Sequence, residues 1–67
     1  MKKLFIKKDA SIKEALRQLD TTGKGCLIVV NNKNKLLGTL TDGDLRRVIL
    51  KGRLIKDKIS NIFRKNP

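Results

Sequence analysis

Acidic and basic side chains gather in one short stretch near the middle of the chain. The segment GTLTDGDLRR contains Asp42, Asp44, Arg46 and Arg47, although the whole chain has only six acidic residues. A carboxylate can accept hydrogen bonds from ribose hydroxyls, and an arginine can bind phosphate. Thr41 and Asp44 also have the T-x-x-[DE] spacing of a helix capping box. The pattern is therefore compatible with a ligand contact, a helix cap, or both at once.

Asp42 and the two arginines have no role that the sequence settles. Two carboxylates beside a phosphate site would repel the phosphate, and Arg46 or Arg47 can offset that charge or pair with the acids. Adjacent residues on a helix point about 100° apart, so only one of the two arginines can easily face a shared cleft. Solvated surface arginine is the alternative interpretation for either one.

No catalytic or metal-binding group is evident. The chain has no histidine and one cysteine, which excludes an internal disulfide and a structural zinc site built from Cys and His. Ser11 and Ser60 have no neighbouring base that would activate them. Cys26 lies in the apolar run CLIVV and reads as a buried small hydrophobe in a reducing compartment. We expect that this chain alone is not an enzyme.

Size and charge restrict the kind of partner. A chain of 67 residues makes one small domain with a marginal core, which favours association or a neighbouring domain. The net charge of +11 favours anionic partners, but the basic residues are scattered and the only aromatic residues are two phenylalanines. This composition argues against a nucleic-acid role. The apolar stretch Leu4–Ile6 is too short for a signal peptide or a membrane span, which predicts a cytoplasmic protein without a membrane partner.

The first half of the chain predicts a strand, a helix and a second strand. Leu4–Ile6 is a short strand, and the capping-box residues Ser11 and Glu14 start a helix over about Ile12–Asp20 that ends near Gly23. The continuous apolar run Cys26–Val30 predicts a strand buried on both faces.

The second half predicts a hairpin, a helix and a helical tail. A polar turn leads into a strand over Leu36–Leu40, in which Gly38 indicates a close approach by ligand or backbone. A second helix starts at Thr41 and stops at Gly52. Ile59, Ile62 and Phe63 have helical spacing, which predicts a short helical tail.

This order of elements, with a Gly-x-x-Thr-x-x-Asp turn after the third strand, resembles a CBS motif, the unit named for cystathionine β-synthase. SIKEALRQLD resembles its first helix, GKGCLIVVNNKNKLLGTLT its hairpin, and ISNIFRKNP the segment leading to a following motif. The resemblance implies an α+β fold of the β-α-β-β-α type, with a small, mostly antiparallel sheet, two helices packed on it and a short C-terminal helical tail. Residues 1–67 would form a single CBS motif, half of a CBS pair and a fragment of a larger protein.

The segment TDGDLRR is similar to a narrower group within that family. It resembles the first CBS motif placed before bacterial sugar-phosphate nucleotidyltransferase domains, and the position of Met1 just ahead of the motif agrees with that order. The CBS region of arabinose-5-phosphate isomerases carries a similar segment and is the alternative parent.

The resemblance also implies a ligand site. In this family the cleft between two paired motifs often binds adenosine-containing ligands, here AMP, ADP, ATP or S-adenosylmethionine, as regulatory ligands and not as tightly bound cofactors. Thr41 would contact the phosphate and Asp44 the ribose. The remaining positions that match the cleft are Thr39, the backbone of Lys24, Gly25 and Cys26, and the slot-lining Ala10 and Leu27. Each of these has loop or core packing as its alternative role.

Three hypotheses remain open at this point. The first is a regulatory nucleotide-binding module that controls an attached catalytic domain through two arrangements of paired motifs. The second is a structural module that pairs with a second CBS motif or forms a homodimer without ligand, burying the helix faces around Leu16 and Val48. The third, nucleic-acid binding, predicts affinity that falls steeply with salt.

Overall fold

The computed structural model describes residues 4–65, so both chain ends, on which the interpretation of Met1 and Pro67 depends, lie outside the described residues. Within this range no helix is long and apolar enough to cross a membrane. The elements in chain order are β1 (Phe5–Lys7), α1 (Ile12–Thr22), β2 (Cys26–Val30), β3 (Leu36–Thr41), α2 (Asp42–Leu50), a 3-10 turn η2 (Ile59–Asn61) and β4 (Arg64–Lys65).

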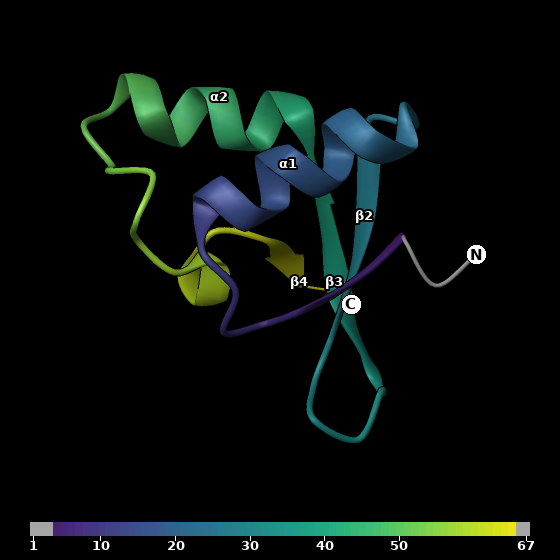
Figure 1. Ribbon diagram of the computed structural model, residues 1–67. Helices are drawn as coiled ribbons and strands as arrows, with labels where there is room; N and C mark the ends of the chain where they lie inside the picture. Colours follow the sequence, from purple (N-terminus) through teal and green to yellow (C-terminus); the bar gives the residue numbers. More distant parts are fainter. Residues whose placement is uncertain (1–3, 66–67) are drawn as a thin grey trace.

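The sheet has the strand order β1-β2-β3-β4 (Figure 1). β1 pairs with β2 in parallel, and the other two pairings are antiparallel, which confirms the mostly antiparallel sheet. In the hairpin, Cys26 at the start of β2 lies opposite Thr41 at the end of β3. The start of β2 and the end of β3 therefore form one edge of the sheet, and α2 begins at that edge.

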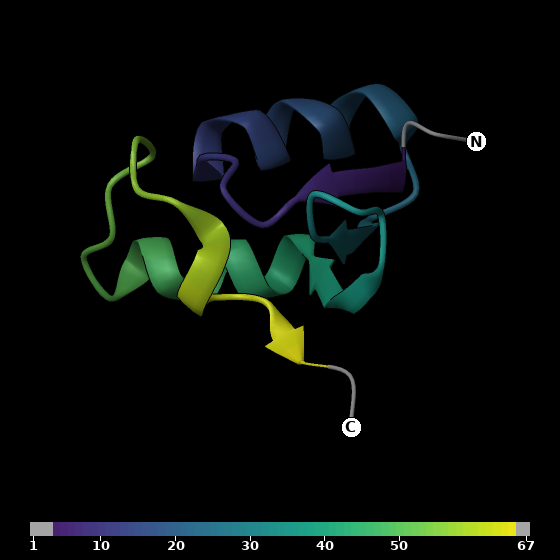
Figure 2. The same cartoon turned by 90° about the horizontal axis from the view of Figure 1, so that it is seen from below.

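Both helices pack on the same face of the sheet, and they lie side by side in Figures 1 and 2. The core is one cluster that joins the inward side chains of the strands to the apolar stripes of the helices. Its fully covered members include Ile12, Leu27, Val29, Leu40, Leu45 and Ile59, each with an exposed fraction of 0%. Burial of this cluster is the main force that orders so short a chain.

The prediction that β2 is buried on both faces is wrong. Leu27 and Val29 point into the core, whereas Cys26 and Ile28 are only half-buried on the opposite face. Phe5 and Thr39, the partners of Ile28 in the neighbouring strands, are exposed there as well. No helix of the described residues covers this face, because both helices were drawn to the other one. Cys26 is accordingly a half-buried residue of the uncovered face and not a core residue.

Local capping explains where both helices begin. Each predicted capping box is present, Ser11 with Glu14 at α1 and Thr41 with Asp44 at α2. α1 runs two residues further than Asp20, since the hydroxyls of the two following threonines donate to carbonyls of the preceding turn. It ends at Gly23, whose φ of 66° is the left-handed conformation that glycine adopts most readily.

The tail is part of the domain but is not an α-helix. Ile59 is buried in a single 3-10 turn, and Ile62 and Phe63 pack beside the core. β4 then pairs with β3, placing Lys65 opposite Gly38, so Gly38 is approached closely by backbone. The helical spacing of the tail was outweighed by pairing along the free side of β3, which satisfies backbone groups that a short helix would leave open.

Candidate functional site

The edge of the sheet where α2 begins collects most of the residues expected to bind a ligand. Cys26 lies opposite Thr41 in the hairpin register, and the backbone N–H of Asp42 donates to the carbonyl of Gly25 at 3.2 Å. Gly25 has a φ of 74°, a conformation that a residue with a β-carbon adopts only with strain. The loop before β2 and the first turn of α2 are therefore held against each other by backbone contacts.

Thr41 and Asp44 form a reciprocal pair at this edge. The N–H of Thr41 donates to the Asp44 carboxylate, the N–H of Asp44 donates to the Thr41 hydroxyl, and both distances are 3.1 Å. Asp44 is 6% exposed, which is unusual for an aspartate and makes it the only buried polar residue among those described. The Thr41 hydroxyl accepts one hydrogen bond in the cap and keeps its own proton to donate. The capping role and a ligand role are therefore chemically compatible.

Each acid of the TDGDLRR segment has its own arginine. Arg46 lies 2.8 Å from the Asp42 carboxylate, at the i,i+4 spacing of a helical ion pair, and Arg47 lies 3.5 Å from that of Asp44. The two pairs balance the charge of the first turn, where the helix dipole contributes partial positive charge. The open question about Asp42 is answered by this pairing. Its spacing from Arg46 was the signal in the sequence that identifies the pair.

Four further predicted residues occupy different surroundings. Lys24 is exposed in the loop next to Gly25, and Thr39 is exposed on the uncovered face of the sheet. Leu27 is completely buried, so its side chain lines the core and no surface slot. Ala10 follows β1 and bonds through its N–H to Lys7.

Ala10 is separated from the other predicted residues along the sheet. Lys7 lies opposite Val30 at the far end of β2, and β2 spans about 13 Å at ~3.3 Å per residue. Within this chain, Ala10 is therefore at one end of the sheet, and Gly25 and Thr41 are at the other.

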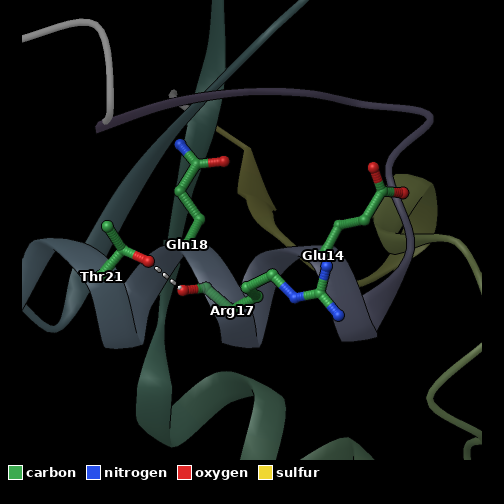
Figure 3. Close-up of a pocket in the computed structure, with 4 residues that line it drawn as sticks. All are labelled: Glu14, Arg17, Gln18 and Thr21. Carbon is green, nitrogen blue, oxygen red and sulfur yellow. Dashed lines mark hydrogen bonds between the residues drawn. The ribbon is translucent and has the colours of Figure 1, made fainter.

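Two shallow hollows help to locate accessible surface. One lies on the outer side of α1, and Figure 3 shows that Glu14, Arg17, Gln18 and Thr21 line it from a single helix. It contains none of the predicted ligand residues, and Gln18 uses its amide to hold the carbonyl of Phe5 at 2.6 Å. The other hollow lies between α1 and the start of α2, and its lining includes residues of the candidate edge. These residues are Leu16, Leu19, Asp20, Gly23, Gly25 and Asp42.

The class of protein follows from the fold together with this edge. A β-α-β-β-α unit with a Thr-x-x-Asp cap at the start of its second helix is the architecture of the CBS motif. A model of the CBS domain matches residues 1–51. The chain belongs to the CBS domain family.

Relatives and solved structures agree with this assignment. The chain is 36% identical over 63 residues to an uncharacterized protein of Helicobacter pylori strain 26695, and 39% identical over 59 residues to one of Chlamydia trachomatis serovar D. These alignments cover 94% and 85% of this chain but 19% and 18% of those proteins. The chain thus spans about a fifth of the length of the curated relatives it matches.

Among solved structures, an uncharacterized conserved protein from Pyrococcus horikoshii matches with a TM-score of 0.84 and 32% identity, over 98% of this chain and 52% of that one. A CBS-domain-containing protein from Agrobacterium tumefaciens matches with a TM-score of 0.86 and 25% identity, over 94% and 48%. A CBS domain protein from Pyrobaculum aerophilum, in complex with AMP, matches with a TM-score of 0.86 and 14% identity, over 92% and 49%. At that identity the last match concerns the fold alone.

Proposed function

We propose that this chain is a regulatory CBS module that binds an adenine nucleotide at the edge formed by Gly25, Cys26, Thr41 and Asp44. The proposal depends chiefly on one observation, the backbone contact that holds the loop at Gly25 against the first turn of α2. That contact places a hydroxyl, a carboxylate and a strained glycine backbone within one small area. The AMP complex of the Pyrobaculum aerophilum protein, which shares the fold, supports the choice of ligand class.

The residues divide the ligand between them by chemistry. The Thr41 hydroxyl donates to a phosphate oxygen near the positive end of α2, and the Asp44 carboxylate accepts from the ribose hydroxyls. Because Arg46 and Arg47 already balance the two acids, an incoming phosphate meets no net negative charge from the first turn. The backbone of Lys24, Gly25 and Cys26, and Thr39 on the same side of the sheet, are assigned to the adenine side of the site.

A second CBS motif completes the site by packing on the uncovered face of the sheet. This face carries Phe5, which is 45% exposed, together with the half-buried Cys26 and Ile28. The helix faces around Leu16 and Val48 are less suitable than the sequence suggested, because both side chains are already packed against the core of this chain. The solved structures also support pairing, since the chain covers about half of each of the three described.

Calorimetric titration tests the ligand proposal. AMP, ADP, ATP and S-adenosylmethionine are titrated into the chain and into the longer parent protein, with Asp44→Asn as the variant. Asn keeps the oxygen that caps Thr41 but loses the charge that strengthens the ribose contact, so we expect affinity to fall about tenfold or more. Glu14→Gln, the same change in the distant capping box of α1, is the matched control and leaves affinity unchanged. Absence of binding to both proteins would remove the proposal.

Pairing without a ligand is the second candidate function, and the exposed Phe5 on an apolar sheet face favours it. Sedimentation of the chain measures self-pairing directly. If the chain forms a dimer that Phe5→Ser dissociates, and no nucleotide binds, the structural role replaces the sensor role. A dimer that also binds nucleotide supports both.

We further propose that the parent protein is a sugar-phosphate nucleotidyltransferase, because the segment TDGDLRR resembles the motif placed before such domains. A sugar-phosphate isomerase carrying a similar segment is the alternative. Assays of the full-length parent for transfer of a nucleotide to a sugar phosphate, and for isomerisation of a sugar phosphate, distinguish the two. In either parent, the nucleotide bound at the CBS edge would change the rate through its differential affinity for two arrangements of the motifs.

A further inference from the structure

Three aliphatic side chains are exposed together at the end of α2 that is remote from the candidate ligand site. Leu50 is 81% exposed, Leu54 55% and Ile55 51%. Leu50 is the last residue of α2, and the other two lie in the loop that follows it, at the left of Figures 1 and 2. We call this area, with the basic side chains around it, the 50–58 surface.

The loop that presents these side chains is held by backbone hydrogen bonds. The N–H groups of Ile12 and Lys13, at the start of α1, donate to the carbonyls of Asp57 and Ile55, both at 2.8 Å. The Asp57 carboxylate accepts from the N–H of Leu54 at 2.8 Å. The aliphatic side chains are thus exposed on an ordered backbone, which reduces the entropy that a partner would have to remove on binding.

Basic residues surround this apolar area. Four belong to the same segment and the fifth, Lys13, is bonded to it through the backbone; the set is Lys13, Lys51, Arg53, Lys56 and Lys58. All five are exposed, and none forms an ion pair with another residue in the described part of the chain. The one acid of the segment, Asp57, is half-buried and occupied by Leu54.

This combination restricts what can bind. Two copies of the chain meeting symmetrically through the same surface would bring five cations of one copy against five of the other, which disfavours self-association here. Nucleic acid matches the charge but has no use for three aliphatic side chains, and the surface offers no aromatic platform. A membrane contact usually includes aromatic or protruding apolar anchors, whereas Leu54 and Ile55 are already about half covered by their own chain.

We propose that the 50–58 surface is a docking site for an acidic protein segment that carries aliphatic residues between its carboxylates. The aliphatic residues of the partner would cover Leu50, Leu54 and Ile55, and its carboxylates would pair with the surrounding lysines and arginine. An apolar centre with a charged rim is the usual composition of a protein interface. Because α2 separates this surface from the nucleotide edge, docking here does not require a ligand at that edge.

Nuclear magnetic resonance titration of the isotope-labelled chain tests the proposal. The probe is a synthetic helical peptide about 18 residues long, with Leu at i, i+3, i+4 and i+7 spacing and Glu elsewhere. We expect chemical-shift changes centred on residues 50–58 and on Lys13, with affinity that falls as salt is raised. A peptide with Ser in place of Leu, and one with Lys in place of Glu, should each bind at least several-fold more weakly.

Matched variants separate this surface from general stickiness. Leu54→Ser with Ile55→Ser should weaken peptide binding about tenfold or more. Leu36→Ser, at a hairpin position that is 51% exposed like Ile55, should leave it unchanged. Should the double variant fail to fold, Arg53→Gln with Lys56→Gln tests the charge component, and binding several-fold weaker than wild type is expected.

Several results would overturn the proposal. These are shift changes centred elsewhere, equal weakening by Leu36→Ser, or no binding of the acidic peptide. Binding of phosphatidylglycerol vesicles, but not of the peptide, through residues 50–58 would replace the protein partner by a lipid surface. Concentration-dependent dimerisation that the Leu54 and Ile55 substitutions abolish would replace it by a second copy. Nucleotide binding measured on the same variants reports separately on the ligand edge.

Discussion

Asp44 and Glu14 have the same capping role in different surroundings, which allows the effect of burial to be measured within one small protein. Both are the third residue of a helix, both accept from the N–H of the capping residue, and both capping residues return a hydroxyl acceptor. Glu14 is exposed, whereas Asp44 is 6% exposed and also lies 3.5 Å from Arg47. We expect replacement by alanine to destabilise the chain much more at Asp44.

The magnitude follows from what Asp44→Ala leaves behind. The N–H of Thr41 loses a charged acceptor in a place with little access for water, and such a hydrogen bond contributes about 1.5–3 kcal/mol. A loss of about 2 kcal/mol in the free energy of unfolding corresponds to a fall of about 10 °C or more in Tm for a domain of this size. At Glu14, water can replace the lost acceptor, so the loss should be clearly smaller.

Urea unfolding followed by circular dichroism, with calorimetric melting as the second measurement, gives both losses. Asp44→Asn is the control, because its side-chain oxygen can still cap Thr41, and its stability should lie between those of the wild type and Asp44→Ala. Equal losses for Asp44→Ala and Glu14→Ala would refute the reasoning, since burial would then have no bearing on the strength of the cap.

Two further predictions concern the tail and the response to acid. Ile59→Ala should cost about 2–4 kcal/mol in urea unfolding, because Ile59 is completely buried although it lies beyond the residues that match the CBS domain model; a loss below about 1 kcal/mol would show that the tail is not part of the core. Hydrogen bonds from the backbone and then the hydroxyl of Ser11 lower the pKa of Glu14 below its ordinary value of 4.5. The ionised carboxylate therefore contributes stability in full above that ordinary value, and the contribution is lost as pH falls through the lowered pKa of the folded state. Glu14→Gln should accordingly be less stable than wild type near neutral pH, and the difference should disappear in acid; a difference that persists in acid would contradict this assignment.

Local signals in the sequence predicted the parts of the fold that depend on neighbouring residues. The spacing of Ser11 and Glu14, and of Thr41 and Asp44, specifies helix starts because the contacts involved are three residues apart. Gly23 marks the end of α1 for an equally local reason, since its φ is positive. The CBS resemblance added the arrangement of these elements, and the structure confirmed it.

The parts that were not predicted depend on contacts between distant segments. β4 forms because the free side of β3 offers hydrogen-bonding groups to a segment more than twenty residues away. An apolar run such as CLIVV carries no information about which face the helices will cover, so the exposure of Cys26 and Ile28 was missed. The family pattern likewise grouped Ala10 with Gly25, whereas the parallel register of β1 and β2 places them at opposite ends of the sheet within this chain.

The sequence by itself determined the helix boundaries, the hairpin, the family and the paired roles available to Thr41 and Asp44, because each of these depends on residue types at short spacing. Only the tertiary structure decided that Asp44 is buried, that each acid of TDGDLRR has its own arginine, and that one face of the sheet is left uncovered. It also brought Leu50, Leu54 and Ile55 to the surface on a loop tied to α1. Burial and exposure arise from the packing of segments far apart in the chain, and no local pattern specifies that packing.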